Sequence, residues 1–256
     1  MRNYIVFIKK EFIEYLRTYK LMIMLIVFVL LGIISPLFAK LTPLILEMSG
    51  IDASAMPDLF AEPDAIASWI QFFSNIGQMG VLCFIIVFSG IFANELTKGT
   101  LINVLTKGLS RATIIFSKFT AAVFIWTLSY AVSILVCYLY TEFYWQTPKF
   151  NHIFLSFFSF WLYGILLLNL LILGGIIFKN IIGSLMLTGG AVVVMMIINI
   201  SPKMLKYNPI TLASNNIELL TGVRPLSDFI PSLLICGGSI IISLTASVII
   251  FNKKQV

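Results

Sequence analysis

The stretch that decides the fold runs from residue 21 to residue 39 and reads LMIMLIVFVLLGIISPLFA. It carries no charged side chain, and its length is close to the roughly 20 helical residues that cross the hydrocarbon core of a bilayer. Because lipid offers no water to the backbone amides and carbonyls, such a segment has to be helical there. The stretch therefore predicts a membrane-spanning helix that begins about twenty residues into the chain.

Five more apolar blocks follow the first one, and each is far longer than a strand of a membrane barrel. The six predicted spans cover residues 21–39, 71–93, 119–139, 153–178, 181–200 and 230–251. The composition agrees, since 59% of the 256 residues are hydrophobic and only 11% are charged, against roughly a quarter charged in soluble domains. The connecting segments are too short for a soluble domain. We expect an all-α polytopic membrane protein with a single transmembrane domain over residues 1–256 and no soluble domain.

The distribution of basic residues predicts the orientation of the spans. Of the 17 Lys and Arg residues, twelve fall on the side that carries both termini and five fall on the other side. Because cytoplasmic flanks carry the excess of Lys and Arg, both termini are predicted to be cytoplasmic, in a multi-pass protein of the cell membrane. The net charge of +6 comes from residues that flank apolar blocks and form no continuous patch, so we expect no nucleic-acid partner.

The sequence carries no pattern that indicates catalysis. The three cysteines lie inside apolar runs, and the single histidine, His152, cannot form the two-histidine motif of a zinc protease. The dipeptide Gly-Lys, which every phosphate-binding loop of the Walker type requires, does not occur. We therefore expect no catalytic residue, metal site or cofactor in this chain, and any ATP would have to be bound by another subunit.

The residues before the first span show a helical pattern. Apolar residues recur at helical spacing from residue 5 to residue 19, and basic and acidic residues lie elsewhere around the helix. The apolar residues are Ile5, Ile8, Phe12, Leu16 and Tyr19. This spacing predicts an amphipathic helix lying in the cytoplasmic interface of the membrane. Such a helix either sets the topology of the first span or docks a partner, and the pattern does not separate these roles.

The segment between the second and third spans, NELTKGTLINVLTKGLSRATIIFSK from Asn94 to Lys118, is too structured for a simple connector. Thr100 is suited to cap a short helix, Gly108 to end it in a left-handed conformation, and Ser110 to cap the next helix. The short helix would carry Leu101, Val104 and Leu105 on one face, flanked by Lys107 and Arg111. Two turns of helix are not stable alone, so the segment needs the membrane or the groove of a partner.

This segment resembles the first cytoplasmic loop of the permease subunits of type-2 ATP-binding-cassette exporters. The resemblance rests on Glu95-x-x-Lys98-Gly99-Thr100, on Leu105, and on Ser110-Arg111 followed by Lys118. The six-span layout, the interfacial N-terminal helix and the long segment before the last span are similar too, so the resemblance covers essentially the whole chain.

The resemblance implies that the loop is a coupling element, which inserts into a separate ATPase subunit. Glu95 would be the acidic coupling residue and residues 101–105 the inserted helix. The coupling residues that it implies are Glu95, Lys98, Gly99, Thr100, Leu101, Val104, Leu105, Lys107 and Arg111. A loop that only lies in the interface, with solvated charges, is the alternative.

The resemblance also implies the partners and the cargo. We expect two cytoplasmic ATPase subunits that bind ATP and magnesium, and a second copy of this chain or a related permease. Small exporters of this kind often move peptides such as toxins and bacteriocins, or antibiotics and lipids. Together with the apolar span interiors, this favours a hydrophobic or amphipathic substrate, most simply a peptide. A non-transporting membrane scaffold or assembly factor is the alternative from another class.

Three amides recur at i, i+4 and i+7 in the second span, at Gln71, Asn75 and Gln78. In a regular α-helix they share one face, where they either hydrogen-bond to neighbouring helices or line a hydrated transport pathway. The single amide side chains of Asn169 and Asn199 are interpreted as forming hydrogen bonds between helices.

Small polar residues at a four-residue step predict close helix packing in the last two spans. They are Ser184, Thr188, Ser239, Ser243 and Ser247. Whether these faces pack within one subunit or between two stays open. The segment 201–229 is broken by three prolines, and its middle, residues 217–220, is either a short helix dipping into the membrane or part of a solvated connector.

Overall fold

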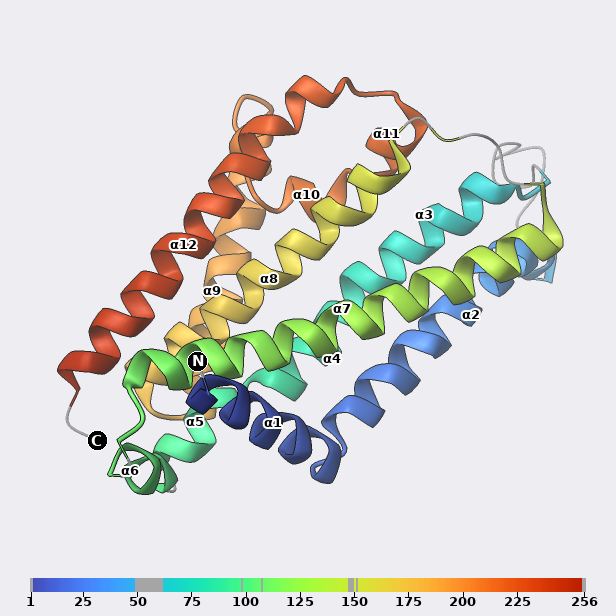
Figure 1. Cartoon of the computed structure of the whole chain (residues 1–256). Coiled ribbons are helices and arrows are strands. Elements are labelled where there is room, and N and C mark those ends of the chain that lie inside the picture. Colours follow the sequence, from blue (N-terminus) through green and yellow to red (C-terminus); the bar gives the residue numbers. More distant parts are fainter. Residues whose placement is uncertain are drawn as a thin grey trace.

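The computed structural model describes residues 2–48, 62–97, 99–106, 108–146, 150 and 152–254. These residues form helices and no strand, arranged as a bundle whose long members run side by side (Figure 1). Six helical segments are long and apolar enough to cross a membrane: Lys20–Ile45, Ala65–Thr97, Arg111–Tyr144, Ile153–Phe178, Ile181–Ile198 and Leu226–Lys253. The predicted all-α fold with six spans is confirmed.

The helices coincide with the predicted bounds at one span and extend beyond them at most others. The fourth prediction coincides with α8 (Ile153–Phe178), whereas the third span is α7 (Arg111–Tyr144), which begins eight residues before the predicted start. Ser110 caps α7, because its hydroxyl accepts a hydrogen bond from the backbone N–H of Thr113 at 3.1 Å. The helix then runs through Lys118, which apolarity alone places outside the span.

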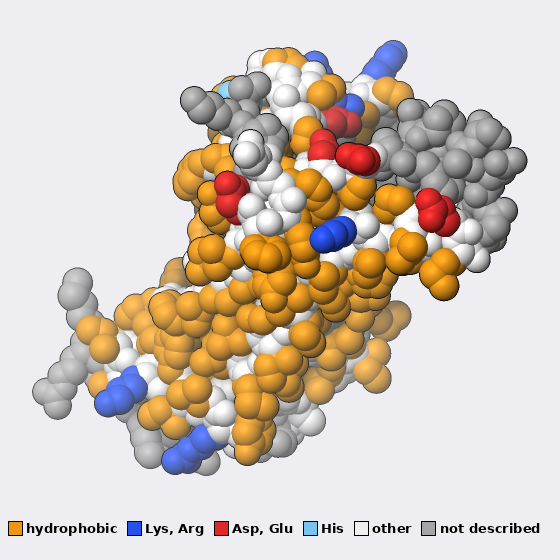
Figure 2. All heavy atoms as spheres, turned by 90° about the vertical axis from the view of Figure 1, so that its right-hand side faces the viewer, with side chains coloured by type: hydrophobic (Ala, Val, Ile, Leu, Met, Phe, Trp, Pro, Cys, Tyr) orange, Lys and Arg blue, Asp and Glu red, His pale blue; other side chains and the backbone are white. Residues whose placement is uncertain are grey.

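The two ends of the bundle differ in content. We call the end that carries Arg2 and Lys254, the first and last described residues, the terminal end, and the opposite end the distal end (Figure 1). The terminal end also holds α1 (Arg2–Arg17), α5 (Gly90–Thr97) and α6 (Thr100–Leu105). Figure 2 shows charged side chains toward both ends of the face that it draws and a broad hydrophobic band between them, as a membrane-spanning bundle requires.

The core is centred on α8. Of the most apolar 18-residue stretch of α8, 72% is buried, against 17% for α9 (Ile181–Ile198) and 17% for the last span, which contains α12 (Ile230–Lys253). Gly164 in α8 makes room for Trp126 of α7, since a Cβ on this glycine would lie only 2.4 Å from the indole ring. The outer faces of α9 and α12 therefore present apolar surface to the surroundings.

The first two spans are both irregular. The first span lies in α2 (Lys20–Met48), which contains Pro36 and Pro43. The second consists of α3 (Ala65–Asn75), a π-helical turn (Ile76–Gly80), α4 (Val81–Phe88) and α5. A π turn adds a residue to the helical repeat, so side chains after it are rotated relative to an ideal α-helix.

The segment between α9 and α12 folds back onto the bundle at the distal end. It contains two short 3-10 turns, Leu205–Tyr207 and Leu226–Asp228, and the helices α10 (Thr211–Ser214) and α11 (Asn216–Thr221). The Asn216 side chain is buried and donates to the backbone carbonyl of Ser156 at 2.9 Å. Residues 217–220, for which a short helix and a solvated connector were both left open, lie in α11, which packs against α8 with Leu219 and Leu220 buried.

Candidate functional site

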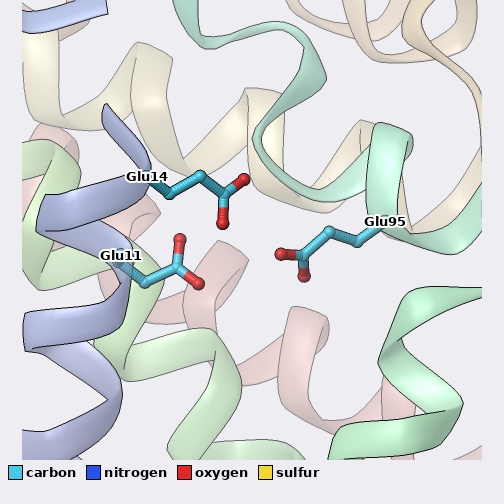
Figure 3. A group of neighbouring side chains, drawn as sticks. All are labelled: Glu11, Glu14 and Glu95. Carbon is cyan, nitrogen blue, oxygen red and sulfur yellow. The ribbon is translucent and has the colours of Figure 1, made fainter. Parts of the chain in front are cut away.

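Five charged side chains from three helices meet at the terminal end, and we call them the terminal charge cluster. They are Lys10, Glu11 and Glu14 of α1, Glu95 of α5 and Lys118 of α7. Figure 3 shows the three carboxylates pointing toward one another across the space between α1 and α5. The cluster therefore joins the N-terminal helix to the end of the second span and the start of the third.

The centre of the cluster is a buried ion pair. The Lys118 ammonium donates to both carboxylate oxygens of Glu11, at 3.0 and 2.9 Å, and both side chains are 1% exposed. Lys118 also lies 3.0 Å from a carboxylate oxygen of Glu95. Since a buried charge without its partner is costly, this arrangement fixes α1 and α5 relative to α7.

Lys10 closes the cluster on its exposed side. Its ammonium lies 2.9 Å from Glu11, 2.6 Å from Glu14 and 2.9 Å from Glu95. Desolvation disfavours the charged form of Lys10, but these carboxylates outweigh it and raise the pKa of Lys10 above its usual value. Oxygens of the three carboxylates lie within 4.8 Å of one another, close enough for a metal ion. Two ammonium groups, those of Lys10 and Lys118, already contact these carboxylates, so the five side chains form an ion-pair network.

The face of α1 that packs on the bundle differs from the predicted apolar face. The predicted stripe was correct as an amphipathic pattern, but Ile5, Leu16 and Tyr19 are more than half exposed. The side that contacts the bundle carries Phe7, Glu11 and Tyr15, which are buried. This side is a second helical stripe at i, i+4 and i+8 with an acid at its centre, and it leaves Ile5, Leu16 and Tyr19 of the predicted stripe facing outward, where an interfacial helix meets lipid.

The short helix predicted in the loop between the second and third spans is α6. Two glycines with left-handed backbone flank it, Gly99 at φ 65° and Gly108 at φ 83°, and Gly108 ends the helix as expected. Thr100 is the first residue of α6, and its hydroxyl donates to the Glu95 carbonyl at 3.4 Å. Leu101 is completely buried in the chain's own core, and Leu105 is half-buried. Leu101 therefore anchors α6 to the bundle.

Three residues of the predicted coupling set have no described side chain. Lys98 and Lys107 lie outside the described residues, and the side chain of Val104 is not described. Thr97, next to Lys98, donates its hydroxyl to the Lys179 carbonyl at 2.8 Å, which connects the end of α5 to the turn between α8 and α9. The coupling roles of Glu95, Lys98, Gly99, Thr100, Leu101, Val104, Leu105, Lys107 and Arg111 stay predictions.

Arg111 connects the loop to the end of the last span. Its guanidinium donates to the carbonyls of Phe251, Asn252 and Lys254, the Asn252 bond measuring 3.1 Å, and it lies over the Phe251 ring at 5.2 Å. A cation at this place also complements the negative end of α12. Lys254 in turn donates to the carbonyls of Ile176 and Ile177 at the end of α8. Desolvation and nearby Lys179 lower the pKa of Lys254.

The three amides of the second span separate into two environments. Asn75 donates to the Ser35 hydroxyl of α2 at 3.0 Å and accepts from Gln71 at 3.2 Å. Gln78 lies in the π turn, donates to Ser74 at 3.1 Å and lines a cavity at the distal end. The expectation of one shared face is wrong for Gln78, because the π turn changes the helical phase after Asn75.

Among the small residues of the last two spans, Ser184 and Thr188 are buried between α9 and α8. Ser184 donates to the Leu171 carbonyl of α8 at 2.7 Å, and a Cβ on Gly174 of α8 would lie 2.9 Å from the Ser184 Cα. In α12, Ser243 and Ser247 are buried, whereas Ser239 is half-buried. The faces that hold Ser184 and Thr188 are thus used within this chain.

Asn169 and Asn199, which were predicted to form hydrogen bonds between helices, do not form them in the part of the chain that the structure describes. Asn169 is completely buried in α8, and within the described residues neither its nitrogen nor its oxygen has a hydrogen-bond partner. The buried oxygen of Asn199 likewise has none among those residues.

A comparison with protein families gives one match over nearly the whole chain. A family model described as ABC-2 family transporter protein matches residues 5–256. No curated protein matches the chain. The match includes α1 from residue 5 onward, the loop with α6 and all six spans.

Proposed function

Because the chain belongs to the ABC-2 family of transporter proteins and is a membrane permease subunit of an exporter of this family, we propose that separate ATPase subunits act on its terminal end. The expected resemblance to type-2 exporters is confirmed at the level of the family. In the proposal, ATP is bound and hydrolysed outside this chain, and closure of two ATPase subunits moves α6. The terminal end then faces the cytoplasm, in agreement with its excess of basic residues.

The observation that carries this proposal is that α6 lies between two helices, α5 and α7, that are each bonded to other helices of the bundle. Leu101 anchors α6 in the core, Glu95 joins the preceding helix to α1 and α7, and Arg111 joins the following helix to the end of α12. A push on α6 would therefore reach the second and third spans through the helices on either side of it, and the last span through Arg111. A mechanical input requires such contacts, since a partner shifts a conformational equilibrium only by interacting differently with the two states.

The cargo proposed for this exporter is a hydrophobic or amphipathic molecule, most simply a peptide such as a toxin or bacteriocin. Among the charged residues of the spans, Glu95 and Lys118 are paired near the terminal end, and the described interior of the bundle is otherwise apolar with isolated amides and hydroxyls. Such an interior suits an apolar molecule better than an ion. A second copy of the chain, or a related permease, would complete the pathway, and the exposed apolar faces of α9 and α12 are available for this contact.

The proposal is tested by purifying the full chain in nanodiscs with candidate ATPase subunits from its own genome. A cysteine is placed at Thr106, which is exposed next to α6, and at Leu226, which is exposed at the distal end as a matched control. We expect a stoichiometric ATPase subunit that crosslinks to Thr106→Cys and not to Leu226→Cys. A chain that binds no ATPase under conditions that preserve other membrane complexes would instead be a scaffold.

A further inference from the structure

An apolar cavity of about 570 Å³ opens in the distal half of the bundle. Its floor includes Phe73 and Tyr163, which are 5% and 3% exposed, and its rim includes Ile70 and Met196, which are 49% and 56% exposed. The volume lies within the range of about 300–1,000 Å³ that is typical of ligand sites. The cavity is therefore large enough for a ligand and open on a side whose rim is apolar.

The cavity lies at the level in the membrane where the acyl chain of a lipid begins, next to its head group. Val192 and Met196 line it, and α9 ends at Ile198, so these residues lie about 3–9 Å below the distal end of α9 at 1.5 Å per residue. A membrane-spanning helix ends near the head-group level. The opening therefore lies where the first carbons of an acyl chain pass.

The wall of the cavity includes the π turn of the second span. Gly77 lies in this turn, and a Cβ built on it would meet only one ring carbon of Phe160, at 3.9 Å. Gln78, from the same turn, supplies one of the few polar side chains in the lining. Single π turns are found disproportionately at functional sites, and here the turn widens the helix beside a cavity.

A second hollow, with cationic side chains, lies next to the first. It has a volume of about 590 Å³ and is lined by Pro202, Lys203, Leu205, Lys206, Arg224 and Asp228. The two hollows share an ion pair, because Glu218 lines the apolar cavity and its carboxylate lies 2.6 Å from the guanidinium of Arg224. Among the described residues, neither Lys203 nor Lys206 has a carboxylate within 4 Å.

The backbone near Lys206 is bonded to two spans. The Ser232 hydroxyl of α12 donates to the Lys206 carbonyl at 2.9 Å, and the Asn208 amide donates to the Met195 carbonyl of α9 at 2.6 Å. The chain around Lys206 is thus bonded to α9 and α12, and the side chains of Lys203 and Lys206 are exposed. Their charge favours an anion at this place.

We propose that the two hollows together bind one anionic amphiphile from the adjoining bilayer leaflet. Its hydrocarbon chain enters the apolar cavity, and its phosphate lies among Lys203, Lys206 and Arg224, with Glu218 holding the Arg224 guanidinium in place. The ligand class is a phosphate-headed lipid. The site lies at the opposite end of the bundle from α6, so it does not depend on the proposed ATPase contact.

The test uses the full chain in phosphatidylcholine nanodiscs that contain phosphatidylglycerol, with bound lipid counted by native mass spectrometry. Gly77→Leu fills the cavity without a backbone clash, and Gly189→Leu is its control, because a Cβ on Gly189 has nothing within 4 Å. The double variant Lys203→Glu, Lys206→Glu removes the cations, and Lys40→Glu, at the distal end but in neither hollow, is its control.

We expect one retained phosphatidylglycerol per wild-type chain and at least a tenfold loss of retention in Gly77→Leu and in the double lysine variant, with both controls unchanged. Glycerol phosphate without a chain should not displace the lipid. Equal retention in all variants overturns the proposal. If only the double lysine variant loses retained lipid, the lipid is held by surface attraction alone, and the proposal is overturned. Displacement of the lipid by glycerol phosphate, or occupation of the cavity by a second copy of the chain, also overturns the proposal.

Discussion

The terminal and distal ends of this bundle handle charge in opposite ways. At the terminal end, five charged side chains from α1, α5 and α7 contact one another, and the central pair of Glu11 and Lys118 is 1% exposed. At the distal end, Lys203 and Lys206 are exposed beside a hollow, and the described carboxylates lie more than 4 Å away. The terminal end is therefore built to keep three helices in a fixed relation, whereas the distal end offers charge and space to a ligand.

The largest effect expected from this comparison is the loss of the buried cation. Lys118→Met leaves the buried Glu11 carboxylate with Lys10 as its remaining partner, and breaking a buried pair costs about 3–5 kcal/mol. We expect the unfolding free energy in mixed micelles to fall by about 3 kcal/mol, toward the lower end because Lys10 remains. The matched distal variant, Lys203→Met, should change it by no more than about 0.5 kcal/mol.

A double variant sharpens this prediction. Glu11→Met with Lys118→Met replaces the pair by apolar side chains, which is often neutral for stability. The double variant should recover most of the loss. If Lys118→Met alone is as stable as the wild type, the cluster does not hold α1 to α7.

The next largest effect is the cost in stability of adding a methyl group to a closely packed glycine. Gly174→Ala at the terminal half of α8 places a Cβ 2.9 Å from the Ser184 Cα, so the backbone of α8 or α9 has to shift, at about 1–3 kcal/mol. Gly77→Ala in the distal half meets only Phe160, at 3.9 Å, and should cost well under 1 kcal/mol. Thermal unfolding of the two variants in the same detergent checks the difference, and equal losses would mean that the space beside Gly77 is closed under these conditions.

The sequence predicted the parts of this fold that follow from apolar length. All six spans, the short α6 and its end at Gly108 could be predicted, because lipid imposes helices and glycine permits a left-handed backbone. The starts of the helices were less certain, because a charged residue such as Lys118 ends an apolar block but not a helix.

The missed features depend on contacts between helices. The pairing of Glu11 with Lys118 joins residues 107 positions apart, and no local pattern encodes such a pair. One signal was present: Phe7, Glu11 and Tyr15 form a second helical stripe beside the predicted one. The π turn at Ile76–Gly80 left no recognisable signal, and it separated Gln78 from the face of Asn75.

A third prediction tests whether the terminal charge cluster also transmits force. Glu95→Gln keeps the shape of the side chain but removes the charge that contacts both Lys10 and Lys118. We expect export per ATP hydrolysed to fall about tenfold, equivalent to about 1.4 kcal/mol in a rate-limiting step, while the chain still inserts and binds its ATPase. Glu14→Gln is the control, because Glu14 is 39% exposed and contacts Lys10 alone among the described ion pairs. Normal export by Glu95→Gln would remove Glu95 from the coupling set.

The smallest expected effect separates the two amides that the π turn divides. Asn75→Leu removes the hydrogen bond to Ser35 that joins the second span to the first, and such bonds in membrane bundles contribute about 0.6 kcal/mol on average. Gln78→Leu removes only a bond within its own helix, beside the cavity, so it should leave stability unchanged within error. Repeated unfolding titrations of both variants resolve this difference. If Gln78→Leu is the more destabilising change, then Gln78 contacts another helix in the membrane, and the phase shift inferred from the π turn would be wrong. If Asn75→Leu is the more destabilising change, the distal half of the second span has two separate roles. Asn75 bonds the span to α2, and Gln78 lines the cavity that is proposed to bind a ligand.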